Sequence, residues 1–60
     1  MNKKEQQEYV SHMIVDAISR NKKHIIVHYA AVNMVINTLV QQGFDIEYMR
    51  DLKYVVISWK

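Results

Sequence analysis

Apolar side chains recur every three or four positions in the N-terminal third of the chain. The residues that share this spacing are Val10, Met13, Ile14, Ala17 and Ile18. Such a stripe is typical of an amphipathic helix that buries one face. Asn2 followed by Glu5 has the form of a capping box, and Asn21 suits the C-terminal cap. The pattern predicts a helix from about Lys3 to Arg20.

A second helical stripe lies in the middle of the chain. Its members are Val32, Val35, Ile36, Leu39 and Val40. Gly43 supplies the stop signal for this helix. Its start is open, because His24–Tyr29 is rich in β-branched residues yet runs into Ala30 without a breaker. We expect a strand at His24–Tyr29 followed by a helix, and one long helix over Lys23–Gln42 is the alternative.

The period changes to two after Gly43. Apolar and other residues alternate from here in the order Phe44, Asp45, Ile46, Glu47, Tyr48 and Met49. This alternation predicts a strand with one solvated face. Residues 50–52 form a short connection to a second strand over 53–59, and the short connection favours an antiparallel hairpin.

The last strand carries apolar side chains on both faces. Val55, Ile57 and Trp59 lie on one face, and Tyr54 and Val56 lie on the other. A strand of this kind is typically central and covered on both sides, whereas the amphipathic strand before it suits an edge. We therefore expect this strand to lie in the middle of the sheet.

Together these elements predict an α+β fold with the order α-β-α-β-β. Residues 1–60 form one small domain, in which two helices cover one face of a three-stranded sheet. A chain this short buries only about 60% of its unfolded surface. We expect a second copy to cover the other face through Tyr54 and Val56, and hence a homo-oligomer, in the simplest case a dimer.

The charge pattern offers one basic patch. The net charge is +2, from eight basic and six acidic residues. Arg20, Lys22 and Lys23 form the only dense cluster of positive charge. A solvated loop is the simpler interpretation of this cluster, and a site for DNA or RNA phosphates is the alternative.

Side chains that carry catalysis or bind metals are sparse. There is no cysteine, so disulfides and thiolate metal sites are excluded. His24 and His28 share one face of a strand or a helix, but together with His12 they show no zinc motif. Ser11 and Ser58 fall within predicted regular elements, and a chain with one glycine has no glycine-rich phosphate loop. We expect a protein that is not an enzyme and that has no metal and no cofactor.

Aromatic and acidic side chains gather on the hairpin. Tyr48, Tyr54 and Trp59 offer rings that can stack on nucleic-acid bases or pack in a protein interface. The acidic neighbours of these rings favour the protein interface. The candidate residues for binding a partner are Asp45, Glu47, Tyr48 and Arg50.

The N-terminal sequence begins with a polar run rather than an apolar one, which predicts no signal peptide. No stretch approaches the ~20 apolar residues of a membrane span. We expect the protein in the cytoplasm and not in a membrane.

The second half of the chain resembles small phage-encoded proteins of the host-takeover or anti-defence type. In that pattern a helix ends in Leu-x-x-x-Gly-(Phe/Tyr), and a hairpin closing on Ile-Ser-Trp follows. The segments 39–44 and 57–59 match it, and the preceding helix and strand are similar. The chain departs from the pattern in lacking a turn glycine between the first helix and the first strand.

This resemblance implies a function class rather than catalytic residues. Small phage proteins of this kind often bind and inhibit a host protein. The resemblance therefore implies a non-catalytic inhibitor of a host protein, in the cytoplasm of the host cell. A small DNA- or RNA-binding regulator is the alternative.

Overall fold

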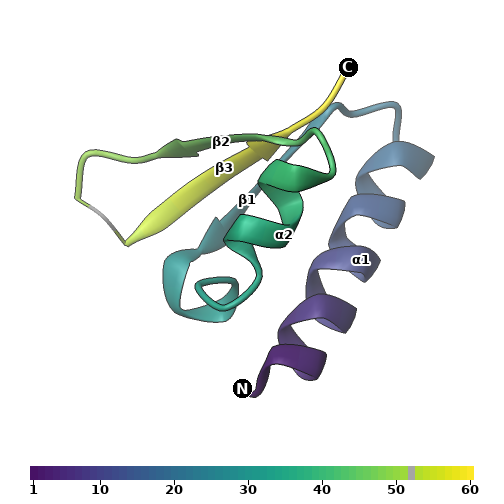
Figure 1. Ribbon diagram of the computed structural model, residues 1–60. Helices are drawn as coiled ribbons and strands as arrows, with labels where there is room; N and C mark the ends of the chain where they lie inside the picture. The colour runs from purple at the N-terminus through teal and green to yellow at the C-terminus, as the bar shows by residue number, and fades with distance from the viewer. Residues whose placement is uncertain (52) are drawn as a thin grey trace.

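A computed structural model describes residues 1–51 and 53–60 of the chain. Its elements are α1 (Lys3–Ser19), β1 (His24–His28), the 3₁₀ turn η1 (Tyr29–Ala31), α2 (Ile36–Gln41), β2 (Asp45–Tyr48) and β3 (Tyr54–Ser58). The predicted order α-β-α-β-β and the α+β class are confirmed (Figure 1). Leu52, in the predicted connection between the hairpin strands, lies outside the described residues.

The capping box at the start of α1 is confirmed. Oδ1 of Asn2 accepts a hydrogen bond from the Glu5 backbone N–H at 2.8 Å, and Oε1 of Glu5 accepts from the Asn2 N–H at 3.1 Å. At the other end Arg20 is the cap residue, one position before the predicted Asn21. Asn21 instead adopts a left-handed φ of 60°, which asparagine tolerates better than most residues and which turns the chain into β1.

The open question about residues 24–29 is resolved in favour of the strand. β1 spans His24–His28, and Tyr29 already belongs to η1. The continuous helix over Lys23–Gln42 is therefore wrong. α2 begins only at Ile36, so the helical spacing that starts at Val32 marks buried positions and not the true helix start.

The C-terminal end of α2 is closed by a glycine turn. Gly43 has a φ of 96°, and its N–H bonds to the Val40 carbonyl at 3.0 Å. The N–H of Phe44 bonds to the Leu39 carbonyl, also at 3.0 Å. These two bonds form a Schellman motif, which satisfies carbonyls that the helix end leaves free. The turn leads the chain directly into β2.

The sheet has the order β1-β3-β2, and both pairings are antiparallel. The last strand is therefore central, as its two-sided apolar pattern predicts, and β2 is an edge. Both helices lie on the same face of this sheet (Figure 1). Within residues 1–51 and 53–60, no helix lies on the other face.

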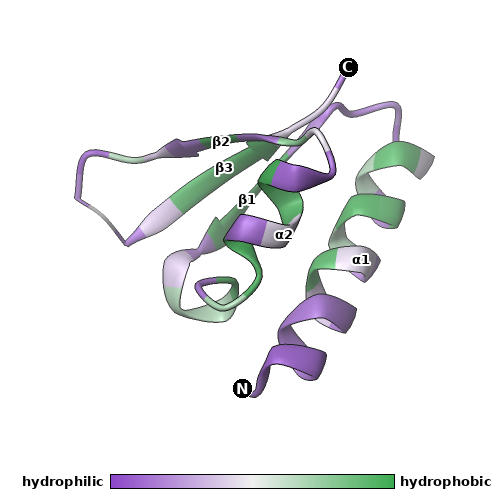
Figure 2. Ribbon diagram, viewed as in Figure 1, coloured by the Kyte–Doolittle hydropathy of each residue, from purple (hydrophilic) through white to green (hydrophobic). Residues whose placement is uncertain are grey.

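The core lies between the helices and the sheet. Its buried members are Val10, Ala17, Ile25, Val27, Val32, Val35, Ile36, Leu39, Val55 and Ile57. Hydrophobic residues accordingly concentrate in β1, β3, α2 and the later turns of α1, whereas the first turns of α1 are hydrophilic (Figure 2). Ile18 and Val40 belong to the predicted apolar stripes but are 54% and 53% exposed. Each lies at the margin of its stripe, and the buried face of each helix is narrower than the stripe.

Candidate binding surfaces

The face of the sheet that lies opposite the helices is exposed and mixed in character. The alternation of β3 turns Tyr54 and Val56 toward this face and places Val55 and Ile57 in the core, as predicted. Tyr54 is 43% exposed and Val56 is half-buried. Both predicted self-association residues therefore lie on the face that no helix covers.

Two of the four predicted partner-binding residues lie on this same face. Glu47 pairs with Val56, and Asp45 pairs with Ser58 in the same register. Opposed residues in a sheet point to the same side, so both carboxylates stand beside the self-association pair. The predicted self-association residues and two of the predicted partner-binding residues therefore lie on one face, although the sequence predicts separate roles for them.

Tyr48 and Arg50 do not belong to that face. Tyr48 pairs with Val55 and so points to the helix side, where its ring lies 6.1 Å from that of Tyr29. Arg50 is exposed in the hairpin turn. The predicted group of Asp45, Glu47, Tyr48 and Arg50 is therefore not one surface, because adjacent residues of a strand point to opposite faces.

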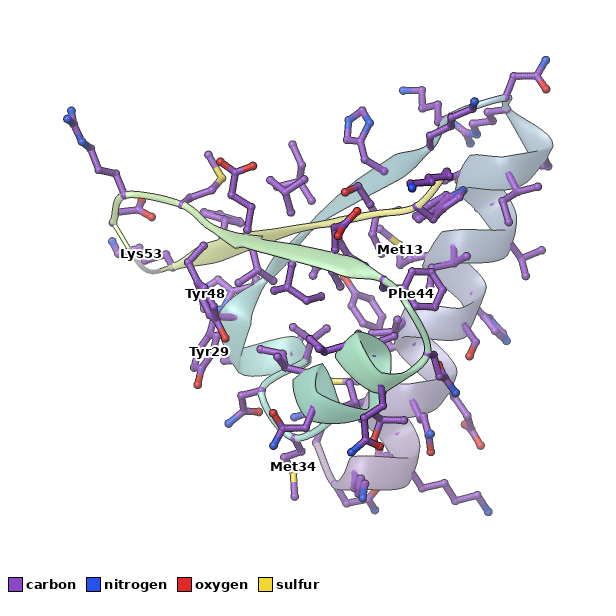
Figure 3. All side chains as sticks on the ribbon, turned by 45° about the horizontal axis from the view of Figure 1, so that its top comes forward. Met13, Tyr29, Met34, Phe44, Tyr48 and Lys53 are labelled. Carbon is purple, nitrogen blue, oxygen red and sulfur yellow. The ribbon has the colours of Figure 1, made fainter. Side chains whose placement is uncertain are left out.

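A second surface surrounds the Tyr29–Tyr48 pair. Tyr29, Met34 and Val40 are 39%, 50% and 53% exposed on η1, the following segment and α2. Figure 3 shows the two tyrosines next to each other at the hairpin end of the sheet, with Met34 further along the same side of the molecule. We refer to Tyr29, Met34 and Tyr48 as the uncharged surface. The sequence contains a sign of this surface, because residues 25–44 include no Asp, Glu, Lys or Arg.

The predicted basic patch gains a member from the end of the chain. The backbone N–H of Trp59 donates to the Lys23 carbonyl at 3.0 Å, which brings Lys60 beside Lys22 and Lys23. A shallow groove of about 290 Å³ runs between these lysines. Arg20 is engaged elsewhere, because its Nε lies 3.3 Å from the Asp16 carboxylate. The cluster is therefore Lys22, Lys23 and Lys60, with Trp59 beside them. The basic patch predicted from the sequence includes neither Lys60 nor Trp59.

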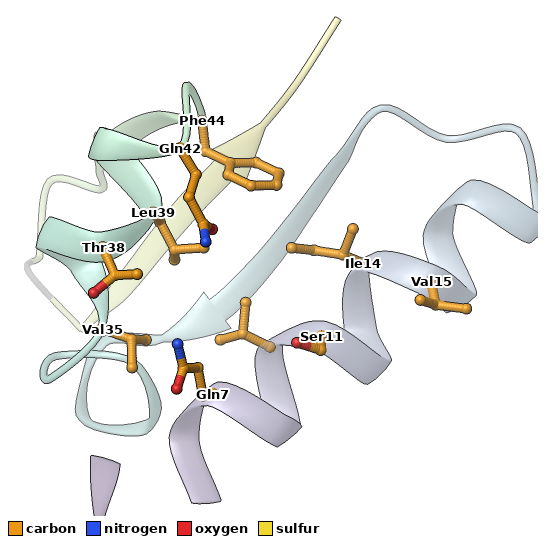
Figure 4. Close-up of a pocket in the computed structure, with 10 residues that line it drawn as sticks. Gln7, Ser11, Ile14, Val15, Val35, Thr38, Leu39, Gln42 and Phe44 are labelled. Atoms are coloured by element: carbon orange, nitrogen blue, oxygen red, sulfur yellow. The ribbon is translucent and has the colours of Figure 1, made fainter. Parts of the chain in front are cut away.

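A groove separates α1 from α2 (Figure 4). It has a volume of about 260 Å³, and its floor is apolar, with Val10, Leu39 and Phe44. Gln7 and Gln42 stand on opposite walls. The side chains that line it are uncharged, so they supply neither an acid nor a base for catalysis.

His28 makes contacts within the fold. Nδ1 of His28 accepts a hydrogen bond from the Ala30 N–H at 3.2 Å and thereby caps η1. The His28 ring also packs edge-on against Tyr54, with centroids 5.4 Å apart. Within residues 1–51 and 53–60, no three His, Asp or Glu side chains gather in a way that would hold a metal ion.

Comparisons of the chain with protein-family models, with curated proteins and with solved structures gave no match. In the part of the chain that the structure describes, no helix combines the length and the apolar character needed to cross a membrane.

Proposed function

We propose that this is a non-catalytic binding protein that docks on another protein through the uncharged surface. The observation that carries the proposal is the charge-free segment 25–44, which nevertheless exposes Tyr29, Met34 and Val40. The centres of protein interfaces are depleted in charged residues and enriched in Tyr and Met, because charges lose hydration when they are buried. A surface of this composition suits burial against a partner better than permanent contact with water.

The hairpin turn supplies the polar rim that such an interface needs. Arg50 is exposed there, and Lys53 follows in the same turn with its carbonyl bonded to the Tyr29 N–H at 2.7 Å. The charged turn therefore borders the tyrosine pair directly. Arg50 keeps its role as a partner-binding residue in this proposal, together with Tyr48.

The partner we propose is a host protein, which the protein inhibits by occupying its surface. This part of the proposal comes from the resemblance to small phage proteins of the host-takeover or anti-defence type. It fits a protein whose charge-free segment serves binding rather than chemistry.

The experiment is affinity capture from a bacterial host lysate treated with nuclease. The tagged wild type is compared with Met34→Glu and Tyr48→Glu, which place a charge on the uncharged surface. Val15→Glu is the matched control, because Val15 is an exposed aliphatic residue on α1. We expect the wild type and the control to retain one host protein that both surface variants lose. Equal capture by all four proteins would contradict the proposal.

A second candidate function is binding of DNA or RNA through the basic cluster. The observation that favours it is the meeting of Lys60 and Trp59 with Lys22 and Lys23, since lysines beside an aromatic ring suit a nucleic-acid strand. Loss of the captured material on nuclease treatment would favour this function over the first.

A further inference from the structure

The face of the sheet opposite the helices is organised in three columns. Its outward side chains are His24, Ile26 and His28 on β1, Tyr54, Val56 and Ser58 on β3, and Asp45 and Glu47 on β2. We call this the open face. Ile26 is 53% exposed, although it is a large aliphatic residue in the middle of a strand. Ile26 pairs with the half-buried Val56, so the middle row of the open face is apolar on β1 and β3 and in contact with solvent.

The two edges of the open face differ in chemistry. The β1 edge carries His24 and His28, whose imidazoles donate hydrogen bonds and accept protons. The β2 edge carries the carboxylates of Asp45 and Glu47, which accept hydrogen bonds. The central strand lies between them and carries Tyr54, Val56 and Ser58, so donors and acceptors flank a column without formal charge.

From this pattern we infer that the open face docks on the open face of a second copy, with a two-fold axis parallel to β3. Rotation about such an axis lays the β1 edge of one copy over the β2 edge of the other. In the register of the sheet, His24 of each copy then faces Asp45 of the other. Glu47 faces Ile26, with His28 at the next outward position of β1, and each of these contacts occurs twice. The central column packs on its own counterpart, with Tyr54 and Val56 near the axis. Two sheets stacked in this way keep their strands nearly aligned, a common arrangement of packed sheets.

The other two-fold arrangement of the same faces has its axis across the strands. It lays β1 over β1 and β2 over β2, so Asp45 and Glu47 of the two copies face each other. Opposed carboxylates repel, so this arrangement is less favourable than the first one. The pattern of carboxylates and imidazoles therefore favours the axis parallel to β3.

The size of the open face sets the strength of the contact. Three strands about 4.8 Å apart and five residues of about 3.4 Å each give a footprint of about 240 Å². Stable interfaces bury about 800 Å² on each partner. A footprint this far below that area makes the dimer weak, so monomer and dimer exchange reversibly. The uncharged surface lies on the helix side and stays free in this dimer.

The test is sedimentation of the wild type and two charge variants of the full chain, from about 1 to about 500 µM, which spans the affinities of weak interfaces. The half swap is Asp45→Lys with Glu47→Lys. The full swap adds His24→Glu and His28→Glu. Glu8→Lys with Asp16→Lys is the control, because it makes the same charge change on exposed positions of α1. Circular dichroism and melting of each variant show that it folds.

We expect the wild type and the control to dimerise with similar constants and the half swap to dimerise at least about tenfold more weakly, which corresponds to about 1.4 kcal/mol. The full swap restores the dimer, because His24→Glu then places a carboxylate opposite the ammonium of Asp45→Lys in the other copy, and His28→Glu lies one outward position from that of Glu47→Lys. A wild type that stays monomeric throughout would overturn the inference, as would a half swap that dimerises like the wild type. A full swap no stronger than the half swap would overturn the proposed axis.

Discussion

The side-chain amide of Gln6, on the first turns of α1, donates a hydrogen bond to Oδ1 of Asn33 at 2.8 Å. The same amide nitrogen reaches the Ala30 carbonyl at 3.3 Å, and Oε1 accepts from the Met34 N–H at 2.9 Å. Gln6 is only 2% exposed, so this polar group is buried and fully engaged. It holds the irregular segment between η1 and α2 against α1, and that segment presents Met34 to solvent.

Replacing Gln6 with Leu tests this role. The substitution keeps the size of the side chain but leaves Asn33 and the Met34 N–H without their partner. A buried polar group that loses its hydrogen bond costs about 1–3 kcal/mol, and we expect a loss of this size in the free energy of unfolding. Chemical denaturation measures it. Gln7→Leu, at the exposed neighbouring position, is the control and should change stability by less than about 0.5 kcal/mol. Equal effects of the two substitutions would refute the role of Gln6.

Gly43→Ala should destabilise the protein through backbone strain alone. A Cβ at this position meets nothing within 4 Å, so no steric clash contributes. The φ of 96° is unfavourable for an alanine, and left-handed backbone costs about 1–2 kcal/mol for a residue with a side chain. Thermal melting of the variant would show this loss. An unchanged melting temperature would mean that the Schellman turn of α2 relaxes without cost.

Leu39→Ala tests the assignment of the buried face of α2. Leu39 is 6% exposed and belongs to the core, whereas the adjacent Val40 is 53% exposed. Removal of a buried leucine side chain costs about 2–5 kcal/mol. That is a large share of the ~5–15 kcal/mol that stabilises a typical domain. Val40→Ala should stay within about 0.5 kcal/mol of the wild type. A reversed order of the two variants in denaturant titrations would show that α2 packs with its other face inward.

The sheet follows from the sequence because strand alternation has a period of two residues. That period places Val55 and Ile57 in the core and Tyr54 and Val56 on the open face, and the register of β2 with β3 places Glu47 beside Val56. It also shows why Tyr48 and Glu47 cannot share a face, a consequence that the predicted partner-binding group overlooks. The predicted partner-binding group joined residues that are close in the chain, and the pleat of β2 places them on opposite faces of the sheet.

The start of α2 and the basic cluster depend on contacts between distant segments. Gln6 bonds to the Ala30 carbonyl, the Asn33 side chain and the Met34 N–H, which supports a non-helical path for this segment. The local spacing of apolar residues contains no sign of these bonds. Lys60 reaches Lys23 only because β1 and β3 pair antiparallel, which brings the start of one strand to the end of the other. The sequence predicts the hairpin and the central place of β3, but not the antiparallel direction of β1 beside β3.

The basic cluster makes a prediction about salt. Each phosphate that a lysine neutralises releases counterions, so the logarithm of affinity falls with the logarithm of salt concentration in proportion to the number of contacts. With Lys22, Lys23 and Lys60 as the contacts, we expect weak binding to single-stranded DNA and a slope no steeper than about −2 to −3. Fluorescence anisotropy across a salt series measures the slope. Replacement of the three lysines by Ala should abolish the binding to single-stranded DNA. A much steeper slope would require a larger basic surface than this cluster.

Hydrogen–deuterium exchange of the protein in complex with its captured host protein tests whether the uncharged surface is the binding site. The experiment compares backbone protection in the free and the bound protein, peptide by peptide. We expect new protection in peptides that cover residues 29–34 and 48–50, where the uncharged surface and its rim lie. Peptides around Lys23 and Trp59 should exchange as in the free protein. New protection confined to the latter peptides, with residues 29–34 unchanged, would contradict binding through the uncharged surface.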